Sequence, residues 1–234
     1  MVPITCRAVV MDIEGTTSAA RYVYDVLFPY ARRQLPAWIS DHGDEPVTAG
    51  AVREVADQLG VSIDDVNAVV EQLQSWIDQD VKAAPLKTLQ GLIWEQGYSK
   101  GELTSHMFDD VPPALHEWHS AGIPLVIYSS GSVAAQHALF ANAEQGDLDA
   151  LIDDNFDITT AGPKREAHSY ERIAQQLGIP AHGLVFLSDV QAELDAASEA
   201  GWQTVGVLRA GEEQATVAQE LHVASFTDLE IRLG

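Results

Sequence analysis

Short apolar runs rich in β-branched residues constrain the fold of this chain most strongly. Four of them are bounded by turn residues, and Phe156–Thr160 is a weaker fifth. Runs of this length and composition predict strands that are buried on both faces of a sheet. The four are Ile4–Met11, Ile123–Tyr128, Leu184–Leu187 and Thr204–Leu208.

Helical patterns follow three of the five runs. Val133–Phe140 follows the second run, Ala167–Leu177 follows the weak run, and Gln191–Ala200 follows Leu184–Leu187 and is ended by Gly201. Apolar strands that alternate with helices predict a parallel sheet covered by helices on both faces. Right-handed crossovers would make this a doubly wound, Rossmann-like α/β domain.

The segment between the first two strands differs in character. Val23–Ile39 has apolar residues at helical spacing, and Pro29 and Pro36 are expected to break or kink that helix. Two amphipathic helices are predicted after it, at Ala51–Leu59 and Ile63–Trp76.

The same segment carries signals for helix ends but almost none for strands. Gly60 is expected to join the two amphipathic helices, and Ser62 with Asp65 is expected to form a capping box at the start of the second. We therefore expect an all-helical insertion, the cap domain, at residues 19–103. The α/β core domain is then residues 1–18 and 104–234.

Composition and charge limit the partners of the chain. Its 234 residues include 13 basic and 35 acidic side chains, a formal charge of −22. A strongly acidic protein is a poor ligand for nucleic acid or an anionic membrane surface. We expect no signal peptide, and no apolar run is near the ~20 residues that span a bilayer. We expect a soluble, cytoplasmic monomer, in which Cys6, inside the first apolar run, is a core residue.

Polar side chains follow the predicted strands, where ligands bind in open α/β sheets. Carboxylates, hydroxyls with a glycine at a helix start, and one lysine would then converge on one crevice. They are Asp12 and Glu14 after the first strand, Ser129 and Ser130 after the second, Lys164 after the weak run, and Ser188, Asp189 and Glu193 after Leu184–Leu187.

This set of groups suits phosphate chemistry on a divalent ion. Asp12 and Asp189 offer oxygen ligands to Mg²⁺, which holds few protein carboxylates and keeps water or substrate oxygens. Ser129, the neighbouring amide groups and Lys164 can surround phosphoryl oxygens. Asp12 can attack phosphorus as a nucleophile, and Glu14 can move a proton to the leaving oxygen.

Six ordered motifs lie between residues 12 and 189. They are DIEGTT from Asp12, DVLFPYA from Asp25, GLIWEQGY from Gly91, YSSGS from Tyr128, GPKREAHSY from Gly162 and FLSD from Phe186. DIEGT is similar to the DxDxT signature of the haloacid dehalogenase superfamily, with Glu14 in place of its second aspartate. Together the six motifs resemble the enolase-phosphatase family of that superfamily.

The resemblance implies a fold, an activity and a cofactor. The fold is a Rossmann-like core with a helical cap. The activity, also called acireductone synthase, enolises 2,3-diketo-5-methylthiopentyl 1-phosphate and then removes its phosphate through an aspartyl-phosphate, a step of methionine salvage. The family uses Mg²⁺, one per chain.

The resemblance also implies a role for each matching residue. Asp12 is the nucleophile and a metal ligand, and Asp189 is the other carboxylate ligand. Glu14 contributes its main-chain carbonyl to the metal and its side chain as acid and base. Ser129, Ser130 and Lys164 match positions that contact substrate. For the enolisation base, Glu14 is the first candidate and a group from the cap is the second.

Other interpretations stay open at this point. The chain could be a phosphatase of the same superfamily that acts on another small phosphomonoester, or a phosphate-binding module without activity. Glu193 fits a solvated acid in a helix as well as it fits the site. Trp94 and Tyr98 fit cap packing better than substrate contact, and His116 with His119 fits an exposed helix face.

Overall fold

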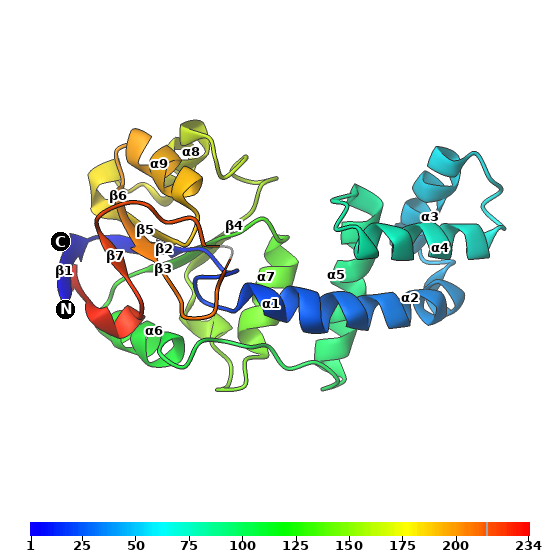
Figure 1. Ribbon diagram of the computed structural model, residues 1–234, viewed down its shortest axis with the longest axis horizontal. Coiled ribbons are helices and arrows are strands. Elements are labelled where there is room, and N and C mark those ends of the chain that lie inside the picture. Colours follow the sequence, from blue (N-terminus) through cyan, green and yellow to red (C-terminus); the bar gives the residue numbers. More distant parts are fainter. Residues whose placement is uncertain (214) are drawn as a thin grey trace. The chain divides into compact units, whose positions relative to one another are not determined.

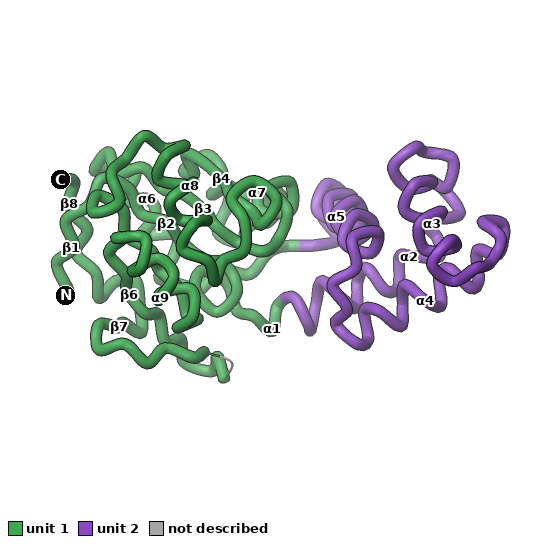
Figure 2. The backbone as a smooth tube through the Cα atoms, turned by 90° about the horizontal axis from the view of Figure 1, so that it is seen from above, with its two compact units in different colours: residues 1–22, 104–234 green, residues 23–103 purple. Residues whose placement is uncertain are grey.

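The computed structural model describes residues 1–213 and 215–234. They divide into two compact units, residues 1–22 with 104–234 and residues 23–103 (Figure 2). The first unit holds all the strands of the described chain, whereas the second holds helices alone. The α/β class with an inserted helical segment is therefore confirmed.

A six-stranded parallel sheet forms the centre of the first unit (Figure 1). Its strand order is β4-β3-β2-β5-β6-β7, with β2 and β5 in the middle. The strands are β2 (Ala8–Met11), β3 (Leu125–Tyr128), β4 (Asp154–Phe156), β5 (Leu184–Ser188), β6 (Gln203–Val207) and β7 (His222–Val223).

Helices cover both faces of this sheet, as in a doubly wound fold. Helices α8 (Ala167–Leu177) and α9 (Gln191–Glu199) lie over one face, and α6 (Val111–Ser120) and α7 (Val133–Ala141) over the other (Figure 1). In the core on the side of α8 and α9, the ring of Tyr170 from α8 contacts the rings of Tyr128, Phe186 and Trp202.

The first predicted strand is in fact two strands. Arg7 interrupts it, and the Arg7 amide donates to Gly183 O at 2.6 Å. Strand β1 (Val2–Cys6) turns away from the sheet and pairs in parallel with β8 (Leu229–Leu233) as a separate two-stranded sheet. Cys6 is buried there as expected, and burial raises the pKa of its thiol to about 11.

The predicted strand at Phe156–Thr160 is mostly wrong. Strand β4 ends at Phe156, because the Asp157 carboxylate accepts hydrogen bonds from the amides of Thr159 and Thr160, at 2.9 and 2.8 Å. This local bonding gives the backbone a turn in place of the ladder of a sheet.

The second unit consists of four helices and a short π-helical turn, η1 (Val23–Leu27). Its core is formed by apolar residues from all four helices, among them Leu35, Val55, Leu73 and Leu89. The helices are α2 (Phe28–His42), α3 (Pro46–Leu59), α4 (Val66–Asp78) and α5 (Ala84–Ser99), and the three-residue α1 (Ala20–Tyr22) precedes η1 in the first unit.

Two details of this unit differ from the expectation. Helix α2 continues past Pro36, because the carbonyl of Arg32, which the missing proline N–H would have bonded, accepts from Gln74 Nε2 at 3.0 Å. Helix α4 starts at Val66 with Asp65 as its own N-cap, accepting from the Ala68 amide, so the capping box with Ser62 does not form.

Candidate active site

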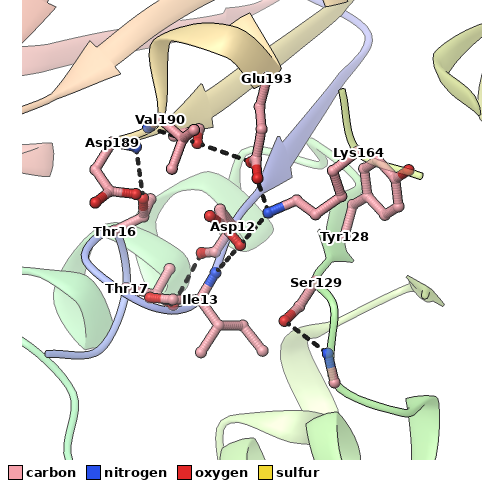
Figure 3. Close-up of polar contacts among 12 residues, drawn as sticks. Asp12, Ile13, Thr16, Thr17, Tyr128, Ser129, Lys164, Asp189, Val190 and Glu193 are labelled. Atoms are coloured by element: carbon pink, nitrogen blue, oxygen red, sulfur yellow. Dashed lines mark hydrogen bonds and ion pairs between the residues drawn. The ribbon is translucent and has the colours of Figure 1, made fainter. Parts of the chain in front are cut away.

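The carboxyl ends of the central strands bring Asp12, Ser129 and Asp189 to one edge of the sheet (Figure 3). Strand β2 ends one residue before Asp12, β3 one residue before Ser129, and β5 one residue before Asp189. Strands β3 and β5 both pair with β2, so these residues lie on neighbouring strands. The prediction that the strand ends converge is confirmed.

The turn that follows β2 is held tightly around Asp12. Asp12 Oδ1 accepts from the Ile13 amide at 2.7 Å, and Thr17 Oγ1 donates to the Asp12 carbonyl at 3.1 Å. Three successive amides, those of residues 16–18, donate to Ile13 O. The Asp12 side chain is therefore held in one orientation.

Gly15 brings this turn against Asp189. Its φ of +76° belongs to the left-handed region, and a Cβ at this position would lie 2.3 Å from Asp189 Oδ2. Any larger residue would displace the Asp189 carboxylate or the turn. The glycine of the DIEGT motif is thus needed both for backbone conformation and for close approach.

Lys164 is a buried cation between two carboxylates. Its Nζ lies 2.6 Å from Asp12 Oδ1 and 2.7 Å from Glu193 Oε2 (Figure 3). Burial by itself would lower the pKa of Lys164, but the two carboxylates outweigh it and raise the pKa above its usual value. The lysine is therefore charged, and it comes from the loop after β4, where Tyr170 Oη donates to its carbonyl at 2.7 Å.

Glu193 belongs to the site, although the sequence left this open. It is only 8% exposed, and its Oε2 also accepts from Ser188 Oγ at 3.1 Å. Burial, and after it the charge of Asp12, raises the pKa of Glu193 to about 7. The signal available in the sequence was its position in the first turn of the helix after Asp189.

Asp189 is a buried acid whose negative charge is only partly compensated by its surroundings. It is 5% exposed, and among the described residues nothing donates a hydrogen bond to its buried Oδ1. Burial raises its pKa to about 7, and the charge of Asp12 contributes in the same direction. A buried carboxylate oxygen without a donor, near a second carboxylate, is a position where a cation would be favoured.

The remaining predicted residues lie in the same loops. Ser129 is buried, and its Oγ accepts from the Gly131 amide at 3.3 Å; within the described chain it bonds neither the site acids nor Lys164. Ser130 is exposed, and Glu14 is half-buried in the turn, where it forms a β-bridge with Ser18. His116 and His119 are both exposed on α6, as expected.

The donor set fits a small divalent ion that keeps part of its water. In the part of the chain that is described, no three His, Cys, Asp or Glu side chains are grouped as a closed metal site. Mg²⁺ needs no such cage, because one or two carboxylates with water and substrate oxygens satisfy it. Asp12 and the unpartnered oxygen of Asp189 meet that requirement.

Comparisons with known proteins agree with this geometry. A profile of the haloacid dehalogenase-like hydrolase family matches residues 6–201. A curated enolase-phosphatase of Frankia alni is 52% identical over 94% of each chain, and one of Pseudomonas syringae pv. syringae is 48% identical over 94% of this chain and 95% of its own. The chain belongs to the haloacid dehalogenase-like hydrolases and, among them, to the enolase-phosphatase family.

Solved structures show the same architecture. The Unknown transcript 4 protein of Saccharomyces cerevisiae is 30% identical, with a TM-score of 0.78 over 94% of this chain and 98% of that chain. A haloacid dehalogenase-like phosphatase of Thermococcus onnurineus has a TM-score of 0.60 at 18% identity, and this likeness shows the fold alone. None of the described helices has the length and apolarity to cross a membrane.

Proposed function

We propose that this protein enolises 2,3-diketo-5-methylthiopentyl 1-phosphate and then hydrolyses its phosphate to give the acireductone. The observation that carries the proposal is the buried group of Asp12, Lys164 and Glu193 beside the unpartnered Oδ1 of Asp189. The identity of about 50% to curated enolase-phosphatases supports this substrate over other phosphomonoesters.

In the phosphatase step Asp12 is the nucleophile. One carboxylate oxygen of Asp12 is held by Lys164 and the Ile13 amide, so the side chain cannot rotate away from the phosphorus. Attack forms an aspartyl-phosphate and expels the enediol oxygen, to which Glu14 delivers a proton; Glu14 then accepts a proton from the hydrolytic water. Ser129, Ser130 and Lys164 bind the phosphoryl oxygens.

The charge balance of the site supports the cofactor. Asp12, Glu193 and Asp189 bring three carboxylates against the single ammonium of Lys164, and the whole chain has a formal charge of −22. A phosphate dianion would be repelled by this site without a further cation. Bound by Asp12, Asp189 and the Glu14 carbonyl, one Mg²⁺ would offset that charge and stabilise the negative charge of the transition state.

For the enolisation, Glu14 is our first candidate for the base, and a group from the cap is the second. We propose that the helical segment, predicted at residues 19–103, is that cap and excludes water from the diketone. The proposal describes a monomeric enzyme of the cytoplasm that acts on a small molecule and binds neither nucleic acid nor membranes.

The test is an assay on the diketone phosphate with and without Mg²⁺. We expect the ultraviolet absorbance of the enediol to appear together with phosphate, and both to be lost with chelator. Phosphate release from other monoesters but not from the diketone would replace this proposal with a phosphatase of different specificity. Binding without any turnover would favour the module without activity.

Asp12→Asn tests the nucleophile in the same assay. Because the amide cannot attack phosphorus, we expect phosphate release to fall by about 10⁴-fold or more. Asp195→Asn, which alters an exposed acid on α9, is the control and should keep full activity. Thermal unfolding of both variants checks the fold, and phosphate release by a folded Asp12→Asn variant would exclude Asp12 as the nucleophile.

A further inference from the structure

Arg209 is a buried arginine that neither the motifs nor the proposed chemistry accounts for. It follows β6 and is only 6% exposed. Its guanidinium carbon, Cζ, lies 4.6 Å from the ring centroid of Phe108 and 4.7 Å from that of Phe226. Packing against two aromatic rings restricts the movement of the guanidinium.

One end of the guanidinium is anchored by Asp110. Arg209 Nη1 lies 2.8 Å from Asp110 Oδ1 and 2.7 Å from Oδ2, and it also donates to the Ala224 carbonyl at 3.2 Å. Asp110 is itself fixed, because it accepts from Ser225 Oγ at 3.0 Å and from the Phe226 amide at 2.5 Å. The ion pair therefore has a defined position in the first unit.

The other end of the guanidinium reaches the turn of the active site. Arg209 Nε donates to the carbonyl of Thr16 at 2.9 Å. Thr16 is fully buried, and its Oγ1 accepts from the amide of Asp189 at 3.1 Å. Thr16 thus bonds Arg209 with its main chain and the Asp189 loop with its side chain.

We propose that Arg209 is a positioning residue of the active site, which acts through Thr16 to keep Asp189 in register with Asp12. The assignment to catalysis rests on the proposed function, whereas the mechanical link does not. Arg209 does not contact Asp12 or Asp189. It holds the turn that starts at Asp12 and, through one hydroxyl, the loop that starts at Asp189.

An arginine is required for this role. Its Nε–H and Nη1–H point to different partners in one rigid plane, so the main chain of Thr16 and the carboxylate of Asp110 are bonded at once. A lysine has a single ammonium on a flexible stem and cannot span both. Because a shift of about 1 Å in reacting groups can cost about 10²-fold in rate, a small movement of this turn should be measurable.

The test compares Arg209→Lys and Thr16→Val with the wild-type protein. Both variants are expected to lower kcat by about 10²-fold while KM changes by less than about threefold, because the groups that bind the phosphate stay in place. The double variant should be no slower than the slower single variant, since both changes break one link. Thr16→Ser keeps the oxygen and should restore activity relative to Thr16→Val.

Two further measurements need no substrate. Hydrogen exchange of the Asp189 amide should be faster in both variants than in the wild type, and Mg²⁺ binding followed by calorimetry should weaken. Leu229→Ala is the control, because it removes a buried side chain from the β1–β8 sheet. It should lower the stability while leaving kcat and the exchange at Asp189 unchanged.

The outcomes separate the two proposals. The positioning role would be overturned if the Asp189 amide of Arg209→Lys exchanged at the wild-type rate. It would also be overturned if Leu229→Ala, at an equal loss of stability, showed the same fall in kcat. Additive effects of Arg209→Lys and Thr16→Val would also overturn it. If the wild type does not turn over the diketone phosphate, the proposed function fails, and faster exchange at Asp189 in the variants still supports the link through Thr16.

Discussion

The first unit contains two buried cations with opposite surroundings. In the Lys164 cluster, one ammonium contacts Asp12 and Glu193. In the Arg209 cluster, one guanidinium pairs with a single carboxylate, that of Asp110, and packs against the rings of Phe108 and Phe226. Both clusters are buried ion pairs with contacts shorter than 2.9 Å, so geometry by itself does not tell them apart.

The two clusters differ in their net charge. The Lys164 cluster keeps a surplus of negative charge, and burial together with that surplus raises the pKa of Glu193 to about 7. The Arg209 cluster is neutral. Burial would raise the pKa of Asp110, but Arg209 and the Phe226 amide outweigh burial and lower it. An unbalanced cluster has charge left to bind a ligand, whereas a balanced one contributes to stability.

Among the changes that compare the two clusters, the largest effect is expected when the cation of the unbalanced cluster is removed. Lys164→Met leaves Asp12 and Glu193 facing each other and takes away a donor to the phosphate. We expect kcat/KM to fall by about 10²–10³-fold, the usual result of removing one stabilising donor. Steady-state phosphate release measures this.

The control for this prediction is Lys100→Met, which removes an exposed lysine that bonds only Gln96 in the described chain. Its activity should equal that of the wild type. If the activity of Lys164→Met stayed within a few-fold of the wild type, the Lys164 cluster would be structural. The two clusters would then not differ in function.

The next effect concerns the balanced cluster and stability. Asp110→Asn leaves the buried charge of Arg209 without a counter-ion, and we expect a loss of about 3 kcal/mol in the free energy of unfolding at pH 7. Asn retains one acceptor oxygen, which puts the value at the low end for a broken buried pair. Denaturant unfolding measures it.

This contribution should depend on pH in a defined direction. The folded pKa of Asp110 is lowered, so its stabilisation is complete above the unfolded pKa of about 4 and is lost as the pH falls through the folded pKa. The difference between the wild type and Asp110→Asn should therefore shrink below about pH 4. A difference that stays constant down to pH 2 would contradict the charge assignment.

An exposed ion pair provides the baseline for this comparison. Arg232 lies 2.6 Å from Glu230, but its side chain is 59% exposed. Arg232→Gln should change the free energy of unfolding by less than about 0.5 kcal/mol, because water screens such pairs.

A further comparison concerns Gly15, the neighbour of Thr16, which bonds both Arg209 and the amide of Asp189. Gly15→Ala strains a φ of +76° and also places a methyl group 2.3 Å from Asp189 Oδ2. Gly122, with a φ of +73° and open space around it, is a matched control. Both variants should lose about 1–2 kcal/mol for the strained backbone.

Only Gly15→Ala should also lose activity, since only there does the added carbon displace a site acid. Thermal unfolding and the phosphate assay are compared for the two variants. Equal activity of Gly15→Ala and Gly122→Ala would mean that the close approach to Asp189 has no role in catalysis.

The sequence was sufficient for the parts of the fold that depend on local pattern and general topology. Buried parallel strands read as apolar runs, and their carboxyl ends must lie together, so Asp12, Ser129 and Asp189 could be placed at one edge of the sheet before the structure was known. Helix α8 has the predicted bounds, Ala167–Leu177, because a strongly amphipathic segment with a glycine after it needs little tertiary information.

Features that depend on distant partners could not be predicted. Arg209 bonds Thr16 and Asp110 across separations of 193 and 99 residues, and no local pattern reports such pairs. Glu193 could not be told apart from a solvated helix acid, because its partner, Lys164, comes from another loop. Helix α2 passes Pro36 because Gln74 of another helix compensates for the missing bond.

The pairing of β1 with β8 has a consequence for folding during synthesis. Val2 pairs with Leu229 and Cys6 with Leu233, so the first strand stays without a partner until residues 229–233 have left the ribosome. Residues 23–103, in contrast, form one continuous compact unit whose contacts are closer in sequence, and such units form sooner. We therefore expect the unit that contains β1 and β8 to complete its folding after residues 23–103 have folded.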